Sequence, residues 1–78
     1  MITPQELTGF IRMALPDAEV EVFDRTGTLD HFTVHVVSNA FKDVGPLDRH
    51  RMVYKAVSEP MADGRIHALE IKTSTREG

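Results

Sequence analysis

The sequence predicts a single α+β domain: a two-layer sandwich in which a three-stranded mixed sheet carries its helices on one face. Three observations lead to this class. Residues 4–14 carry an amphipathic helical repeat, residues 18–23 and 31–37 alternate like strands, and a helix near 48–58 precedes a strand over 65–73. With a short helical turn after the second strand, the order is helix, strand, strand, short helix, helix, strand. We expect the first two strands to pair antiparallel, and the crossover through the helices to return the third strand parallel to a neighbour.

The first helix has clear start and stop signals. Thr3 is a good N-cap, Pro4 suits the first helical position, and Glu6 completes a capping box with Thr3. Pro16 ends the helix. One apolar face follows from the spacing i, i+3, i+4 and i+7, which falls on Leu7, Phe10, Ile11 and Ala14.

Two segments then alternate with the period of a half-buried strand. In the first, Ala18, Val20 and Val22 alternate with glutamates, and residues 24–30, which contain Gly27, are expected to form a loop. The second segment has two distinct faces, with Phe32, Val34 and Val36 on one and His31, Thr33, His35 and Val37 on the other.

A helical region connects the second strand to the last. Ser38 or Asn39 caps a short turn, which a Gly-Pro pair ends. The main helix follows over about 48–58, and Pro60 with the next Asp-Gly pair closes the region. We expect one apolar stripe on this helix, made of Leu47, His50, Val53, Tyr54 and Val57.

The last strand, over 65–73, places His67, Leu69 and Ile71 on one face. Residues 73–78 are polar and are expected to be a flexible tail.

Composition limits the classes of function. The 78 residues have room for one domain, spanning 1–78, and an apolar fraction of 41% suffices for a modest core. The chain has no cysteine, and therefore neither a disulfide nor a thiolate for a metal site of its own. The net charge of −3 gives no general footprint for nucleic acid. There is no signal-peptide pattern and no apolar run of about 18 residues, so we expect no membrane association and a cytoplasmic protein.

No catalytic motif is present. Without cysteine there is no thiol nucleophile, and Ser38, Ser58 and Ser74 lack a nucleophile-elbow setting. Neither of the common glycine-rich phosphate-binding motifs occurs. We therefore expect a protein that binds a partner and is not an enzyme.

The four histidines differ in their predicted positions. We expect His35 to be a solvated residue of the sheet face, and His50 to be partly buried and hydrogen-bonded to backbone. His31 and His67 stand at the beginnings of strands, where side chains can reach a partner or a metal. Two imidazoles rarely hold a metal by themselves, so the missing ligands would come from water or another protein.

A basic run on the main helix is the rival feature. Arg49, Arg51 and Lys55 could contact phosphates from one helix. The simpler interpretation is a solvated helix face, because Asp48 and Glu59 dilute the charge.

Several anchors in the same order make the chain resemble BolA-like proteins over nearly its whole length. They are HF-x-V-x-VVS from His31, then Phe41, R-H-R-x-VY from Arg49, and I-H-A-L-x-I-K-T from Ile66. The resemblance implies a KH-like fold. It also implies a monothiol glutaredoxin as partner, with a [2Fe–2S] cluster held between the two proteins in iron–sulfur trafficking or iron sensing.

In that arrangement the glutaredoxin and glutathione supply thiolates, and the BolA-like protein supplies imidazoles. The resemblance assigns His67 in IHAL and His31 in DHF as these ligands. Alone, the protein would hold no cofactor and would be a monomer or weak homodimer. A cluster-free adaptor that docks the same glutaredoxin is the second interpretation.

DNA binding is the alternative that the family also implies, resting here on Arg49, Arg51 and Lys55. KH domains clamp nucleic acid with a GXXG loop, which this sequence lacks. The chain also departs from the family pattern at Asp43, where members usually carry glycine, and this predicts a remodelled turn near Gly45. The usual T-x-T-P ending is also changed, because Arg76 stands in place of the proline.

Overall fold

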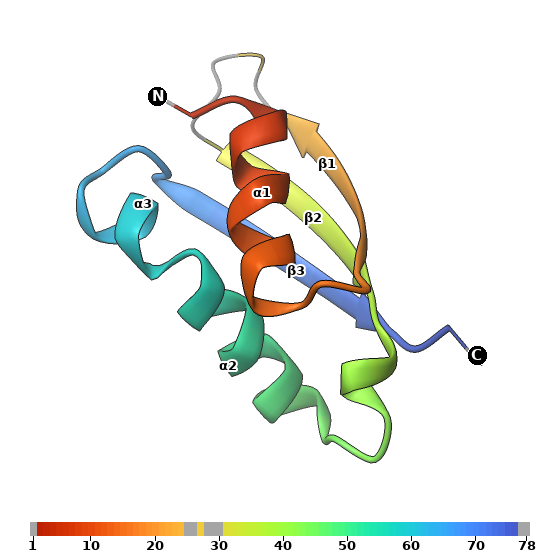
Figure 1. The fold of residues 1–78 in the computed structure, drawn as a ribbon. Coiled ribbons are helices and arrows are strands. Elements are labelled where there is room, and N and C mark those ends of the chain that lie inside the picture. Colours follow the sequence, from red (N-terminus) through yellow and green to blue (C-terminus); the bar gives the residue numbers. More distant parts are fainter. Residues whose placement is uncertain (1, 25–26, 28–30, 77–78) are drawn as a thin grey trace.

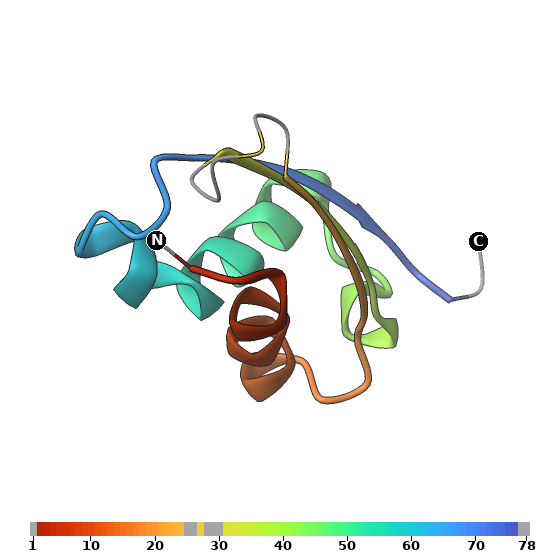
Figure 2. The same cartoon turned by 90° about the horizontal axis from the view of Figure 1, so that it is seen from above.

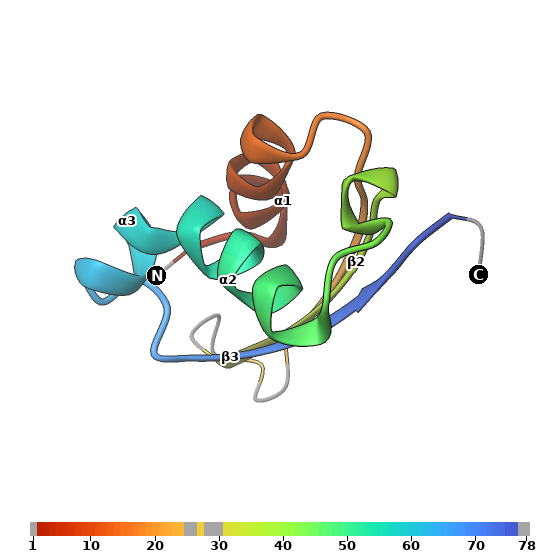
Figure 3. The ribbon, with the colours of Figure 1, turned by 90° about the horizontal axis from the view of Figure 1, so that it is seen from below.

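A computed structural model describes residues 2–24, 27 and 31–76, and it has the predicted α+β architecture (Figure 1). The three strands form one sheet in the order β1-β2-β3. Figures 2 and 3 show the helices together on one face of this sheet. The elements along the chain are α1 (Pro4–Ala14), β1 (Glu19–Asp24), β2 (His31–Val37), the 3₁₀ helix η1 (Asn39–Phe41), α2 (Pro46–Ala56), α3 (Ser58–Ala62) and β3 (Ala68–Ser74).

The predicted strand pairing is confirmed. β1 pairs antiparallel with β2, from Glu19 opposite Val37 to Asp24 opposite Phe32. β2 pairs parallel with β3, beginning with His31 opposite Ala68. η1, α2 and α3 form the crossover between β2 and β3, and Figure 2 shows the helices of the crossover on the same face of the sheet as α1.

The core lies between the sheet and the helices. The predicted inner face of β2 is buried, and Leu7 and Ile11 of α1 pack against it. The predicted capping box holds the start of α1, because the backbone N–H of Glu6 donates to Thr3 Oγ1 and that of Thr3 donates to Glu6 Oε1, each at 3.1 Å. The prediction that Ala14 is part of the apolar face is wrong: it is exposed, and Leu15 is buried after the helix ends.

The predicted apolar stripe of α2 is also partly wrong. Leu47 is 65% exposed and Tyr54 41%, and His50 is exposed as well, whereas Val53 and Val57 are buried as expected. α2 is therefore rotated about its axis relative to the prediction. Residues three and four apart define several overlapping stripes on a helix, so their spacing did not specify which stripe is buried. The half-buried side of the helix instead carries Arg49, Met52 and Ala56.

The element boundaries near the C-terminus differ from those predicted. The helical region ends at the predicted Asp63-Gly64 pair, but Pro60 lies buried inside α3, where the first turn tolerates proline. β3 runs from Ala68 to Ser74 and therefore includes the first two residues of the expected tail, 73–78. The loop predicted over 24–30 lies mostly outside the described residues.

The turn after η1 contains a strained residue. Asp43 has φ +62°, a left-handed backbone conformation that residues other than glycine rarely adopt. Gly45, which comes later in the turn, does not have a positive φ: its φ is −68°, and it is the N-cap of α2. The turn therefore needs a positive φ at position 43, and an aspartate adopts it.

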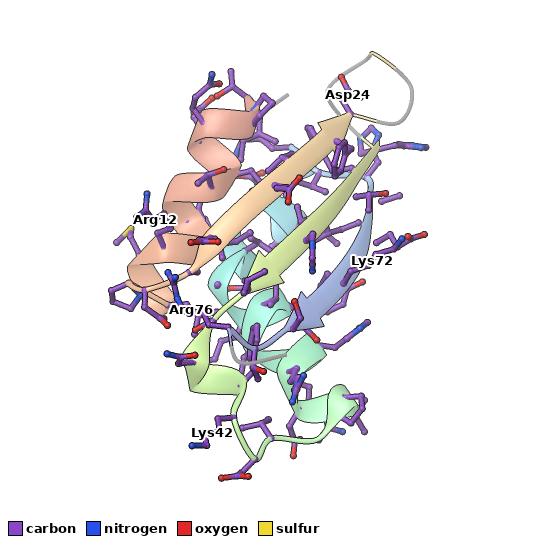
Figure 4. The ribbon with its side chains drawn as sticks, turned by 90° about the vertical axis from the view of Figure 1, so that its right-hand side faces the viewer. Arg12, Asp24, Lys42, Lys72 and Arg76 are labelled. Carbon is purple, nitrogen blue, oxygen red and sulfur yellow. The ribbon has the colours of Figure 1, made fainter. Side chains whose placement is uncertain are left out.

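A polar cluster joins distant parts of the chain at the end of the sheet where β1 begins and where β2 and β3 end. Asp17 accepts hydrogen bonds from Ser38 Oγ at 2.6 Å and from the backbone N–H of Asn39 at 2.9 Å. The Ser38 hydrogen bond, together with that from Asn39, lowers the pKa of Asp17 from its usual value. Arg76, labelled in Figure 4, donates to the Asp17 carbonyl at 2.7 Å and to Glu19 Oε1 at 3.0 Å.

We expect Ser38→Ala to lower the free energy of unfolding by about 1–2 kcal/mol, because it removes the N-cap of η1 and a partly buried hydrogen bond. The loss should shrink as pH falls. The lowered pKa of Asp17 gives stability that is present above its unfolded value near 4 and is lost on acidification through the folded value. Urea denaturation across the acidic range checks this. The exposed Ser58→Ala is the control, and an equal loss at every pH would contradict the expectation.

We expect Asp43→Gly to raise the free energy of unfolding by about 0.5–1 kcal/mol, because glycine adopts positive φ without a steric cost. Asp43→Ala is the matched comparison and should be less stable than Asp43→Gly, since alanine keeps the Cβ that makes a positive φ costly. Thermal denaturation of the three proteins tests the effect. Equal stability of the glycine and alanine variants would show that the conformation at residue 43 carries no strain.

Candidate functional site

The fold brings together the two histidines that were predicted as ligands. His31 is the first residue of β2, and His67 immediately precedes β3. Their ring centroids lie 6.4 Å apart, with the ring planes inclined at 72°. Both residues are exposed. The pair therefore forms a small imidazole site at one end of the sheet.

Parallel pairing explains why these rings meet. In a parallel ladder both strands begin at the same end, and His31 is opposite Ala68, the neighbour of His67. The segment before β3 is anchored by Ile66, whose side chain is buried and whose N–H donates to the Pro60 carbonyl at 3.1 Å. His67 thus follows a fixed point of the core, while its own ring lies at the surface.

Among the described residues, the donor set is incomplete for a metal site. Among residues 2–24, 27 and 31–76, no group of three His, Cys, Asp or Glu side chains could hold a metal ion. Two imidazoles suit one iron of a Rieske-type [2Fe–2S] centre, where two histidines replace two cysteines. The remaining ligands of such a centre would be thiolates, which this chain does not contain.

The other two histidines lie elsewhere. His35 is half-buried on the open face of the sheet, and its Nε2 lies 3.0 Å from Ser74 Oγ, so it is less solvated than we expected. His50 was expected to be partly buried, and this is wrong, because it is exposed on α2. Neither belongs to the His31–His67 pair.

The predicted basic set on α2 is divided by the fold. Arg49 is half-buried, its Nε donates to the Val44 carbonyl at 2.7 Å, and its guanidinium carbon lies 5.9 Å from the ring centroid of Phe41. Arg51 and Lys55 are exposed one turn apart. Arg51 makes one loose contact, at 3.5 Å, with Asp48. Arg49 thus supports the fold, and the exposed cations of the set are Arg51 and Lys55.

Within the part of the chain that the structure describes, no helix has the length and apolar character needed to cross a membrane.

A family model described as BolA-like protein matches residues 12–78. The chain therefore belongs to the BolA-like family, as its sequence anchors indicated.

Relatives support this assignment over different lengths. An uncharacterized protein of the rpoN-murA intergenic region of Acinetobacter guillouiae is 34% identical over 73 residues, which are 94% of this chain and 84% of that protein. BolA-like protein 1 of Mus musculus is 49% identical over 49 residues, or 63% of this chain, but the match spans 35% of the mouse protein. The relative from Vibrio cholerae named DNA-binding transcriptional regulator BolA is 41% identical over 51 residues, 65% of this chain and 47% of that protein.

Solved structures show the same fold. BolA1 from Arabidopsis thaliana superposes with a TM-score of 0.83 at 27% identity, covering 94% of this chain and 90% of that chain. Yeast Fra2 superposes with a TM-score of 0.77 at 35% identity, covering 97% of this chain and 82% of that chain.

Proposed function

We propose that this protein is a non-enzymatic partner of a monothiol glutaredoxin and shares a [2Fe–2S] cluster with it, with His31 and His67 as its ligands. The observation that carries the proposal is the pairing of these exposed rings, with centroids 6.4 Å apart, by two strands that begin side by side. Membership of the BolA-like family supports the choice of partner, because the resemblance implies a monothiol glutaredoxin.

The chemistry of the chain explains why a partner is needed. With no cysteine, the protein can contribute imidazoles, and a glutaredoxin with glutathione would contribute the thiolates. When bound, the cluster supplies iron that can be transferred or change oxidation state. The role of the two histidines is to offer ring nitrogens at the surface as ligands.

The proposal is tested by mixing the protein with a reconstituted [2Fe–2S] monothiol glutaredoxin and recording visible circular dichroism. We expect wild type to produce a new heteromeric spectrum, and His67→Ala and His31→Ala to lose most of it, because each removes one imidazole ligand. His50→Ala is the matched control, since His50 is exposed on α2 and lies outside the pair. Size-exclusion chromatography of the same mixtures measures association independently of the cluster.

Each combination of results has a distinct meaning. A heteromeric spectrum that depends on His67 and survives His50→Ala supports cluster sharing. Association without any spectral change would replace it with the cluster-free adaptor. Failure to associate would reject the glutaredoxin as the partner.

DNA binding is the second candidate, favoured by the exposure of Arg51 and Lys55 on successive turns of α2 and by the name of the Vibrio cholerae relative. In this case Arg51→Ala and Lys55→Ala should each reduce the slope of log affinity against log salt by about one, because each removes one phosphate contact. Gel-shift titration at several salt concentrations measures the slope. Arg12→Ala, on α1, is the control, and a slope unchanged by all three substitutions would exclude α2 as a DNA-binding element.

A further inference from the structure

The two outer edges of the sheet differ. On β3, the hydroxyl of Tyr54 donates to the Leu69 carbonyl at 3.1 Å, and Ile71 is only 5% exposed. A side chain of α2 therefore occupies one outward carbonyl of β3. β1 forms the other edge, and Figure 4 shows α1 beside it, with α2 behind the sheet. Its six residues pair with β2 without a bulge, and they include neither proline nor lysine, two devices that commonly protect an exposed edge.

The pairing identifies which backbone groups of β1 point outward. The N–H of Ser38 donates to the Ser74 carbonyl, so the even-numbered residues of β2 and Ser38 face β3, and the odd-numbered residues face β1. Their partners Glu19, Glu21 and Phe23 then bond inward. The backbone N–H and C=O groups of Val20 and Val22 therefore point away from β2. Among the described residues, these groups have no hydrogen-bond partner outside the sheet.

An open groove runs along these two valines. It has a volume of about 370 Å³ and lies between the first turns of α1 and the outer edge of β1. The half-buried side chains of Val20 and Val22 form the apolar part of its lining. The lining residues are Pro4, Gln5, Thr8, Val20 and Val22.

We propose that this groove binds an extended basic peptide of a partner protein as a fourth strand beside β1. A helix lying alongside an unpaired edge strand is an arrangement that accepts a peptide by strand addition, with backbone hydrogen bonds supplying affinity and side-chain pockets supplying selectivity. Peptide residues opposite Val20 and Val22 project into the groove, which suits small apolar side chains. Peptide residues between them project to the open face of the sheet.

The charge of β1 selects a basic peptide. Glu21 is exposed on the open face and makes no hydrogen bond or ion pair among the described residues. Among the described residues, Glu19, on the same face, has one exposed contact, with Arg76. A lysine or arginine opposite Glu21 would form a favourable cross-strand pair, and Phe23, which is 53% exposed, offers an apolar contact to the next residue on that face.

The same charges argue against a second copy as the occupant. Two β1 strands paired edge to edge would place glutamates of one chain close to glutamates of the other, and like charges across a strand pair are destabilising. The groove shares no residue with the histidine pair, so this binding is separate from the proposed ligation of a cluster.

The test uses the full chain, labelled with ¹⁵N, and the capped peptide Thr-Val-Lys-Val-Lys-Val-Thr. A matched peptide with glutamate in place of both lysines is the comparison. We expect saturable shifts of the β1 and α1 amide signals with the lysine peptide, slower hydrogen exchange at Val20 and Val22, and little change at Ile71. Binding of the glutamate peptide should be weaker by about threefold to fivefold or more, the scale of one exposed cross-strand charge pair.

Two variants separate strand addition from general charge attraction. Glu21→Lys should reverse the preference between the peptides, whereas Glu70→Lys, on the same sheet face but on β3, should leave the preference for lysine in place. Val22→Pro removes an outward N–H that β2 does not use, and it should abolish binding while the circular dichroism stays that of the folded protein.

Four results would overturn the proposal. They are no shift with millimolar lysine peptide, equal binding of both peptides, shifts centred on α2 and β3, or concentration-dependent shifts at β1 without peptide. The last would identify a second copy as the occupant.

Discussion

In the parallel ladder between β2 and β3, both strands begin at the same end of the sheet. The chain must therefore return along the sheet from the end of β2 to the start of β3. The crossover supplies α2 and α3, which lie on the face where α1 also packs. Val53, Ile71 and Val34 meet in this single apolar layer. The same ladder places His31 beside the approach to β3, so the histidine pair is a direct consequence of the topology.

The crossover also makes the two outer edges of the sheet different. α2 passes beside β3, and Tyr54 hydrogen-bonds to an outward carbonyl of that strand. At β1, α1 packs against the inner face of the strand and leaves a groove along its edge. The domain thus offers two surfaces of different chemistry: imidazoles at the strand starts and outward backbone groups at β1.

Polar contacts hold the opposite end of the sheet. Asp17 connects the turn before β1 with Ser38 and Asn39 at the start of η1, and Arg76 reaches it from beyond β3. These contacts link segments that are far apart in sequence at a point where all three strands come together. They explain why a chain without disulfides can keep the strand ends in place, although much of the cluster lies near the surface.

The sequence alone determined the features that depend on local patterns. The capping box at Thr3, the buried face of β2 and the order of elements follow from cap chemistry and from hydrophobic period, and the structure confirms them. The importance of His31 and His67 could be inferred from their positions at strand starts and from the family anchors. Their proximity was not contained in any local pattern, because the residues are far apart along the chain and meet only through strand register.

Tertiary structure alone decided how α2 is rotated, which arginine is available and which edge is open. Periodicity allows several stripes on one helix, and contact with Phe41 and Val44 selected the one that buries the stem of Arg49 and exposes His50. The alternation of Val20 and Val22 with glutamates predicts a strand, but it does not say whether another strand lies beside it. That depends on the sheet order, which is set by the long-range packing of the crossover against the sheet.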